Sequence, residues 1–441
     1  MIKGWRTPAL NVLFFSLNPV DWYLFDKGLS LMNQNLRDIF QAAAGKYLSA
    51  VDAEVTRSHQ HEIGGLVKMG FGDVLGLPGK DETRELMCKM VYITDETGEP
   101  LIADDLVTWY DIRRKSKTRS PEYRLYYREN SVTESINEGD FLLITKLVNG
   151  SLLMCFTPAD SVIEAQLREL FGLTGLLDET FHRADTGDKK LLLPVQTLFE
   201  QLGISFESEQ KTDKELLAFL LEHYPEGLPK SHVFSELARK RKPANPMKDP
   251  DEALMEWLTE EEHIFRTYER YLVSNRLRHG FGDNGSDVDT FIDFSLSVHN
   301  RRKSRMGFSF ENHLGHLFNL HGLKFEKGSS KKTTENKSKP DFLFPSFDAY
   351  HDKNYDAEKL ILLGAKTTCK DRWRQVLAEG DRLKTKYLVT IQPGISKAQL
   401  TEMRDKHLNL IVPFPLWETY SHDVHQELMS VKEFIELVAS T

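Results

Sequence analysis

An aspartate and a lysine stand at the ends of two apolar runs in the last third of the sequence. Asp341 opens the run 342–344, and Lys366 closes the run 360–365, about 25 residues further on. If both runs are strands, the two side chains lie at one edge of neighbouring strands. A metal-dependent phosphodiesterase needs both: a carboxylate to hold Mg²⁺, and a cation beside the attacking water and the scissile phosphate. Each residue alone is equally well explained by a turn or a solvated strand end.

A helix predicted directly after this lysine supplies a second carboxylate. Thr368 and Asp371 have the spacing of a capping box, so we expect a helix over 370–383. Arg372 and Glu379 fall on one face of that helix at 3.6 residues per turn. A surface ion-pair face would explain this pattern in isolation. Joined to the strand-end pair, it indicates a metal site.

A third carboxylate comes from an upstream helix expected over 305–321. Its apolar stripe is Phe310, Leu314, Leu317 and Phe318, and Glu311 is aligned with the packed side. Buried carboxylates are rare unless they are paired or bound to a metal. A satisfied core glutamate is the competing interpretation.

The C-terminal part, from about 249 to 438, resembles the EcoRII-like branch of the PD-(D/E)XK nuclease superfamily. The resemblance is carried by 297–305, 339–346, 349–352 and 366–375, and extends to 403–404 and 427–429. The chain departs from the general superfamily pattern at Gly364, where an acidic residue usually precedes the lysine by two positions. In the EcoRII-like branch that carboxylate comes from the following helix, and Glu379 stands at the matching position.

The resemblance implies a Mg²⁺-dependent type II restriction endonuclease that hydrolyses double-stranded DNA at a specific sequence. Asp341 and Glu379 would hold the metal, and Glu311 would act behind them or on a second ion. Lys366 would orient or deprotonate the water and stabilise the developing phosphorane charge. The resemblance also places Tyr350 and Arg372 at positions important in the EcoRII site.

The same resemblance implies a segment that reads the DNA sequence. Lys370, Asp371 and Arg372 match the segment with which relatives recognise CC/GG pairs. The side-chain types suit that task, because Arg and Lys donate to guanine O6 and N7 and Asp accepts from cytosine N4.

Composition is that of a large intracellular enzyme. The chain has 441 residues, and its three cysteines are too few and too scattered for a disulfide framework. No signal-peptide layout or membrane span is visible, so we expect a cytoplasmic protein without a membrane partner. The net charge is −9, but basic clusters at 113–119, 239–242 and 301–305 are expected to contact the DNA backbone. A solvated loop is the alternative for each cluster.

The N-terminal part reads as short strands with turn signals, typical of a barrel or sandwich. Strands are expected at 86–94, 106–112 and 123–127, and a hairpin at 141–156 turns at Asn149-Gly150. A helix is expected at 161–171. The residues expected to read DNA from this scaffold are Arg57, His59, Gln60, Arg119 and Arg124. Loop polarity without function is the alternative. The part resembles, more weakly, the EcoRII effector domain, a DNA-binding pseudobarrel.

The sequence therefore predicts a two-domain protein. Residues 1–175 form a mainly β DNA-binding effector domain, 176–205 a linker, and 206–441 an α/β endonuclease domain with a mixed central sheet. In that domain we expect strands at 341–344, 360–366, 387–391 and 409–413, helices at 213–223, 255–277, 396–407 and 424–438, and a mobile loop at 327–339.

The resemblance also implies partners and regulation. We expect a homodimer that cuts both strands, an N-terminal domain that restrains the nuclease until it binds DNA, and a cognate DNA methyltransferase as a genetic partner only. Two other functions stay open: a nuclease directed to modified DNA, and a DNA-binding regulator with a relict nuclease fold. The intact set of Asp341, Lys366 and Glu379 weighs against the relict.

Overall fold

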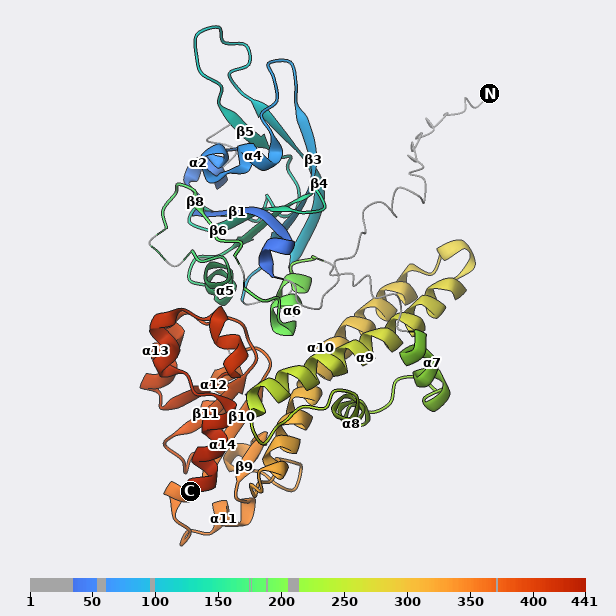
Figure 1. Cartoon of the computed structure of the whole chain (residues 1–441), viewed down its shortest axis with the longest axis vertical. Helices are drawn as coiled ribbons and strands as arrows, with labels where there is room; N and C mark the ends of the chain where they lie inside the picture. The colour runs from blue at the N-terminus through green and yellow to red at the C-terminus, as the bar shows by residue number, and fades with distance from the viewer. Residues whose placement is uncertain are drawn as a thin grey trace, which may run out of the picture.

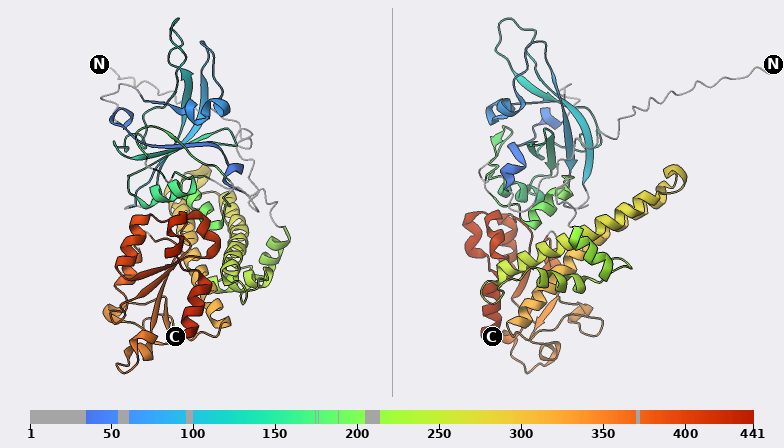
Figure 2. Two further views of the ribbon diagram at one scale, coloured as in Figure 1. Left: turned by 60° about the vertical axis from the view of Figure 1, so that its left-hand side comes forward. Right: turned by 45° about the vertical axis from the view of Figure 1, so that its right-hand side comes forward.

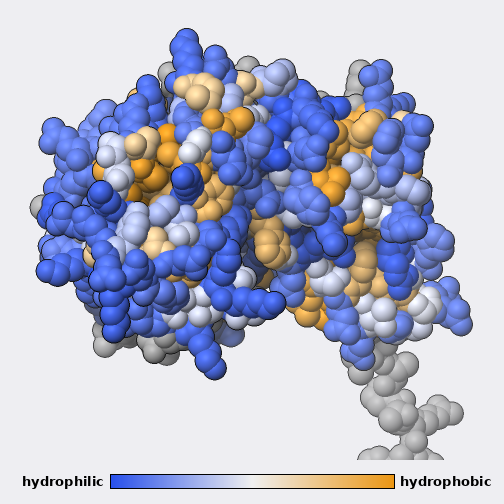
Figure 3. All heavy atoms as spheres, turned by 90° about the horizontal axis from the view of Figure 1, so that it is seen from below, coloured by the Kyte–Doolittle hydropathy of each residue, from blue (hydrophilic) through white to orange (hydrophobic). Residues whose placement is uncertain are grey.

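A β-rich N-terminal region sits on a larger C-terminal region that combines long helices with a small sheet (Figure 1). The computed structural model describes residues 35–53, 61–95, 100–173, 175, 177–187, 189–204, 214–369 and 372–441, with the backbone alone for Asn336 and Arg372. The face seen from below is mostly hydrophilic, with several hydrophobic patches (Figure 3). In the ranges described, no helix is long and apolar enough to span a membrane.

The N-terminal region is built on one twisted sheet. Its described strands are β1 (Phe40–Tyr47), β2 (Glu62–Gly64), β3 (Arg84–Tyr92), β4 (Leu101–Asp111), β5 (Tyr123–Tyr126), β6 (Phe141–Leu147), β7 (Leu152–Thr157) and β8 (His182–Arg183). They are ordered β2-β5-β4-β3-β7-β6-β1-β8. All neighbours are antiparallel except β3 and β7. The expected hairpin is confirmed, with β6 and β7 paired across Asn149 and Gly150, whose φ of 99° suits glycine.

Two apolar cores lie against this sheet. One packs α5 (Val162–Leu170) and α6 (Leu193–Gln201) against β1 and β6, and the other lies under α4 (Phe71–Leu75) and includes Trp109. A four-residue helix, α2 (Ala50–Ala53), follows β1. The helix expected at 161–171 is confirmed as α5, whose N-cap Ser161 accepts from the backbone N–H of Glu164.

The segment 176–205, expected as a linker, is largely part of this N-terminal core. It contains β8, which pairs with β1, and α6, whose Val195 and Phe199 are fully buried. The mixed charges and Gly187 suggested a linker, but the apolar spacing of 191–202 packs α6 against the sheet. The folded N-terminal region therefore extends to about residue 204.

Long helices form the first half of the C-terminal region: α7 (Lys214–His223), α8 (Ser231–Arg241), α9 (Pro250–His279) and α10 (Val288–Leu320). Asp249 caps α9 by accepting from the backbone N–H of Glu252. Two helices exceed their predicted bounds, and α8 had no prediction. The antiparallel ends of α9 and α10 project from the body as an arm (Figure 2). Most residues of the α10 extension are exposed, the apolar Val288, Phe291, Ile292 and Leu296 among them, so packing against the core does not account for this part of the helix.

The second half holds a four-stranded mixed sheet, as predicted. Its strands are β9 (Phe342–Phe344), β10 (Ile361–Lys366), β11 (Lys386–Thr390) and β12 (Leu408–Ile411), in the order β12-β11-β10-β9. β10, β11 and β12 are parallel, and β9 runs antiparallel to β10. The helices are α11 (Phe347–His351), α12 (Arg372–Leu377), α13 (Lys397–Asp405) and α14 (Val431–Ser440).

Three predictions here need correction. The helix expected at 370–383 is shorter: α12 ends at Leu377, and Gly380, with a φ of 67°, turns the chain. The helix expected at 424–438 begins at Val431, where Ser430 and Glu433 form a capping box. The loop 327–339 was expected to be mobile, but the backbone N–H of Gly328 donates to Pro340 O, and a 3₁₀ turn at Glu335–Lys337 contacts the core. Its polar composition concealed these long-range contacts.

Candidate active site

The structure brings Asp341 and Lys366 into direct contact at one edge of the C-terminal sheet. Because Phe342 pairs with Leu363 in the antiparallel ladder, the start of β9 lies beside the end of β10. Asp341 Oδ2 accepts from Lys366 Nζ at 2.7 Å and from the backbone N–H of Ala365 at 2.7 Å. Both charged side chains are mostly buried.

Glu379 reaches the same place from the turn that follows α12. Its Oε2 atom is buried and has no hydrogen-bond partner among the residues that the structure describes. Burial and the nearby charge of Asp341 raise the pKa of Glu379 to about 7, against the opposing effects of Lys366 and Lys386. An unpaired buried carboxylate oxygen is costly, so a partner from outside the protein is implied.

Glu311 adds a third carboxylate from α10. Burial and the charge of Asp341 raise its pKa, while Lys327, whose Nζ lies 3.5 Å from Glu311 Oε2, opposes that rise. Burial and one shared neighbour, Asp341, thus raise the pKa of both carboxyl groups. A bound cation would relieve this repulsion.

The donor set suits a hard divalent ion. In the described ranges, no group of three or more His, Cys, Asp or Glu side chains is close enough to hold a metal by itself. Mg²⁺ does not require such a group, because it is commonly bound by one or two carboxylates together with waters and substrate phosphates. Asp341 and the unpaired oxygen of Glu379 fit that requirement.

A network behind the site holds the Glu379 turn. Glu335 Oε2 accepts from Tyr350 Oη at 2.5 Å and from the backbone N–H of Asp381 at 3.1 Å. The Arg382 guanidinium donates to carbonyls at the end of α11, including that of Asp352 at 2.8 Å. Tyr350 is 2% exposed, and its hydroxyl pKa is raised by burial and by Glu335. Tyr350 therefore lies beside the site and supports it through the turn.

The predicted reading segment is described only in part. Lys370 and Asp371 lie outside the described residues, and Arg372 opens α12 with only its backbone described. The residue before them is anchored: the backbone N–H of Cys369 donates to Gln392 Oε1 at 2.6 Å. Gln392 is buried, and its carbonyl accepts from Tyr420 Oη at 2.7 Å.

The predicted N-terminal readers differ among themselves. Arg57, His59 and Gln60 lie outside the described residues. Arg119 is exposed on the β4–β5 loop, and its backbone N–H donates to Ser116 Oγ at 3.1 Å.

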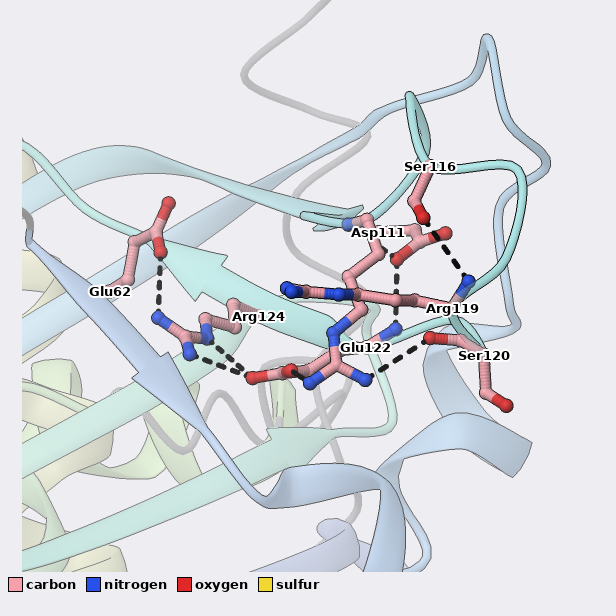
Figure 4. A network of polar contacts seen from close by, with 8 residues as sticks. Glu62, Asp111, Ser116, Arg119, Ser120, Glu122 and Arg124 are labelled. Atoms are coloured by element: carbon pink, nitrogen blue, oxygen red, sulfur yellow. Dashed lines mark hydrogen bonds and ion pairs between the residues drawn. The ribbon is translucent and has the colours of Figure 1, made fainter.

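The prediction for Arg124 conflicts with the structure. Its guanidinium donates to Glu122 Oε1 from Nε at 3.0 Å and from Nη2 at 2.7 Å, and to Glu62 Oε2 from Nη1 at 3.2 Å (Figure 4). While Glu122 and Glu62 occupy this guanidinium, Arg124 does not present the free fork that a bidentate contact with guanine requires. Arg124 braces β5 against β2 instead.

Much of the basic sequence near the nuclease also serves internal contacts. Arg302 Nε donates to the buried Glu269 at 2.6 Å, and Arg305 lies between the rings of Phe234 and Phe265. These two residues of the 301–305 cluster are therefore not available for the DNA backbone in this structure. Sequence reasoning also missed Glu335 and Gln392, because both act across long sequence separations and neither belongs to a local pattern.

Comparison with known proteins identifies the family of the chain. Residues 265–435 match the protein family described as EcoRII C terminal. The chain is 33% identical over 394 residues to the type II restriction enzyme EcoRII of Escherichia coli, covering 88% of this chain and 92% of that enzyme.

Two solved structures are also similar, at low identity. Metal-depleted Ecl18kI in complex with uncleaved, modified DNA has a TM-score of 0.41 and 16% identity, covering 52% of this chain and 83% of that one. The complex of restriction endonuclease PspGI with substrate DNA has a TM-score of 0.40 and 15% identity, covering 48% and 93%.

The extent of the match to EcoRII, together with the cluster of Asp341, Lys366 and Glu379, leads to one conclusion. This chain belongs to the EcoRII family of type II restriction endonucleases.

Proposed function

We propose that the chain hydrolyses double-stranded DNA at a specific sequence with Mg²⁺ held by Asp341 and Glu379. The observation that carries this proposal is the contact of 2.7 Å between Lys366 Nζ and Asp341 Oδ2, beside a buried and unpaired Glu379 oxygen. When bound, the ion supplies Lewis-acid activation of the scissile phosphate and of the attacking water.

The protein's own groups complete the chemistry. Lys366 orients the attacking water and stabilises the negative charge that develops on the phosphorane. Its ammonium is fixed by Asp341, which is itself fixed by the backbone N–H of Ala365. Glu311, whose carboxyl interacts electrostatically with Asp341, acts behind the two metal-holding carboxylates or on a second ion. Tyr350, through Glu335, keeps the turn of Glu379 in register with the strand ends.

Recognition is proposed to rest on Lys370, Asp371 and Arg372. The residue before this segment is held by the buried Gln392, and the segment leads directly into α12. Readers that are attached to a fixed strand end stay in register with the catalytic groups, so a wrong base misplaces the scissile phosphate as well.

The N-terminal region is proposed to be a separate DNA-binding effector domain that restrains the nuclease. Contacts between the two regions support this proposal. Arg266 of α9 donates to Glu200 of α6 at 2.8 Å, and Gly394, in the loop after β11, lies against Gln166 of α5. The same loop carries Gln392, so the N-terminal region touches the loop that anchors the reading segment.

A homodimer is proposed because one active site per chain can attack only one strand in each binding event. The arm offers a surface for it: Val288, Phe291, Ile292 and Leu296 are exposed by 46–57% along one side of α10. A row of large apolar side chains on a projecting helix is typical of a protein interface.

A plasmid cleavage assay tests the function. Supercoiled DNA, methylated and unmethylated, is incubated with the full chain with and without Mg²⁺, and the products are mapped. We expect discrete fragments that require the ion. Cleavage of methylated DNA alone would favour a nuclease directed to modified DNA, and binding without any cleavage would favour the relict regulator.

A truncated chain tests the restraint. Since α6 belongs to the N-terminal core, a chain that begins at Lys214 removes that region without cutting through its core. We expect it to form a dimer and to cut single-site DNA at least as fast as the full chain. A folded but inactive truncation would contradict the restraint and leave the nuclease assignment standing.

A further inference from the structure

A pocket of about 290 Å³ opens beside the active site, between α8, α10 and the segment that follows α10. We call it the α8–α10 pocket. Its polar lining comes from His232 and Arg239 of α8, His316 and Asn319 of α10, Lys327, and Glu311. Glu311 is also the carboxylate that faces Asp341, so the pocket and the active site share one wall.

Basic groups dominate this lining. Arg239 and Lys327 are cations, and His232 and His316 add two imidazole rings. Glu311 is the one acidic residue among the described residues of the lining, and its Oε2 lies 3.5 Å from Lys327 Nζ, so it offsets part of the positive charge. The four side chains that carry nitrogen donors outnumber the single carboxylate of Glu311, so the lining favours an anion as ligand.

Arg239 is fixed with its guanidinium at the pocket. Its Nη1 donates to His313 Nδ1 at 3.1 Å, and His313, fully buried, has its Nε2 3.0 Å from Glu261 Oε2. Accepting at Nδ1 leaves His313 with its proton on Nε2, directed to Glu261. Burial lowers the pKa of Arg239, and the charges of Glu261 and Glu236 oppose that effect without an ion pair to the guanidinium among the described residues.

The walls of the pocket are held together independently of a ligand. Asn312 Nδ2 donates to Ser231 Oγ at 3.2 Å and to Ser235 Oγ at 3.1 Å, which joins α10 to α8. Lys327 Nζ donates to the backbone carbonyl of Glu311 at 3.3 Å and lies 4.7 Å from the centre of the Phe342 ring. The cations are therefore positioned in advance, which reduces the entropy lost on binding.

We propose that the α8–α10 pocket binds a backbone phosphate of the DNA strand that Asp341 and Lys366 attack. This inference rests on the proposed nuclease function. A phosphate is the group that matches a fixed guanidinium, a lysine and imidazole donors. The wall shared through Glu311 places the pocket next to the scissile position, so one strand can reach both. Such a contact positions the substrate without reading its sequence.

Binding of the full chain to DNA tests this site. The duplex carries the cleavage site mapped from wild-type digests, and dissociation constants are measured without divalent ions over a range of salt. We expect Arg239→Gln to weaken binding roughly tenfold and to lower the slope of log K against log salt by about 1. Lys432→Gln is the matched control, because Lys432 is exposed on α14, outside the pocket and outside the three basic clusters of the sequence.

A second variant guards against loss of fold. His232 is exposed at the rim, so His232→Glu adds a negative charge without disturbing the core. We expect it to weaken binding as well. Duplexes with a single neutral methylphosphonate identify the contacted phosphate: one position should weaken the wild type but not Arg239→Gln.

Two results separate the possible failures. If wild type cleaves DNA while Arg239→Gln and His232→Glu both keep its affinity and salt slope, the pocket does not bind phosphate. The same conclusion follows if every methylphosphonate affects wild type and Arg239→Gln equally. If wild type does not cleave any DNA, it is the proposed function that fails.

Discussion

The charged side chains that the sequence marked as functional have different surroundings in the two regions of the molecule. In the C-terminal region, Asp341, Glu311 and Glu379 converge from three elements, and an oxygen of Glu379 stays buried without a partner. In the N-terminal region, Arg124 looked equally functional but is occupied by two carboxylates. A buried carboxylate oxygen without a partner beside an aspartate–lysine pair points to a ligand, whereas a charge paired with its neighbours points to structure.

The largest expected effect lies in the convergent cluster. We expect Asp341→Ala, Lys366→Ala and Glu379→Ala each to lower the rate of DNA cleavage by roughly 10²-fold or more with the fold intact. Single-turnover assays measure the cleavage rate, and circular dichroism checks that the fold is intact. Lys384→Ala is the control, because Lys384 is exposed. Near-normal cleavage by Lys366→Ala would mean that the Asp341–Lys366 pair is not the catalytic centre.

The reading segment comes next. Arg372→Ala should cost about 1–3 kcal/mol of discrimination at one guanine and relax specificity there. Cleavage of duplexes that carry each base at each site position measures this. A uniform loss across all sequences would mean that Arg372 contacts phosphate instead.

The support behind Glu379 should have a smaller effect. Glu335→Ala removes the acceptor of Tyr350 Oη and of the Asp381 N–H, so the Glu379 turn loses its anchor. We expect roughly tenfold slower cleavage and weaker metal binding, with partial rescue by Glu335→Gln. Glu358→Ala, at an exposed acid, is the matched control. Metal affinity equal to that of wild type would limit Glu335 to a role in stability.

The raised pKa of Glu379, at about 7, predicts a pH dependence of metal binding. Below pH 7 the carboxyl is increasingly neutral and an ion must displace its proton, so affinity should fall by up to about tenfold per pH unit. For the metal-free protein, a raised pKa means that this group's contribution to stability is lost as pH rises through 7. Calorimetry at pH 6 and pH 8 tests both, and an unchanged dependence in Glu379→Gln would assign the effect to another group.

The smallest effects should separate two arginines of the N-terminal region. Arg124→Ala should reduce the free energy of unfolding by roughly 1 kcal/mol, because it breaks contacts with Glu62 and Glu122. Arg119→Ala should leave stability unchanged and weaken DNA binding a few-fold. Thermal unfolding and DNA affinity are measured for both variants. If Arg124→Ala alone weakened DNA binding, the roles of the two arginines would be the reverse of those assigned.

Local patterns in the sequence determined the two strands, β9 and β10, that position Asp341 and Lys366. The apolar run that follows Asp341 and the apolar run that precedes Lys366 pair as predicted, because their spacing and apolar content leave one buried arrangement. The Asn-Gly hairpin and the helix α5 were equally local. Glu311, Asp341 and Glu379 could be named in advance because each lies on or next to a predicted helix or strand, although Glu379 lies in the turn after α12 and not within the predicted helix.

Only the tertiary structure decided which charged residues are satisfied. Arg302 and Arg305 share one basic run, yet α9 and α8 bury them against Glu269 and Phe234. Glu335 looked like part of a mobile loop, yet it bonds a tyrosine and a turn that lie 15 and 46 residues away. Burial and pairing depend on which distant element packs nearby, and a periodic pattern carries no information about that neighbour.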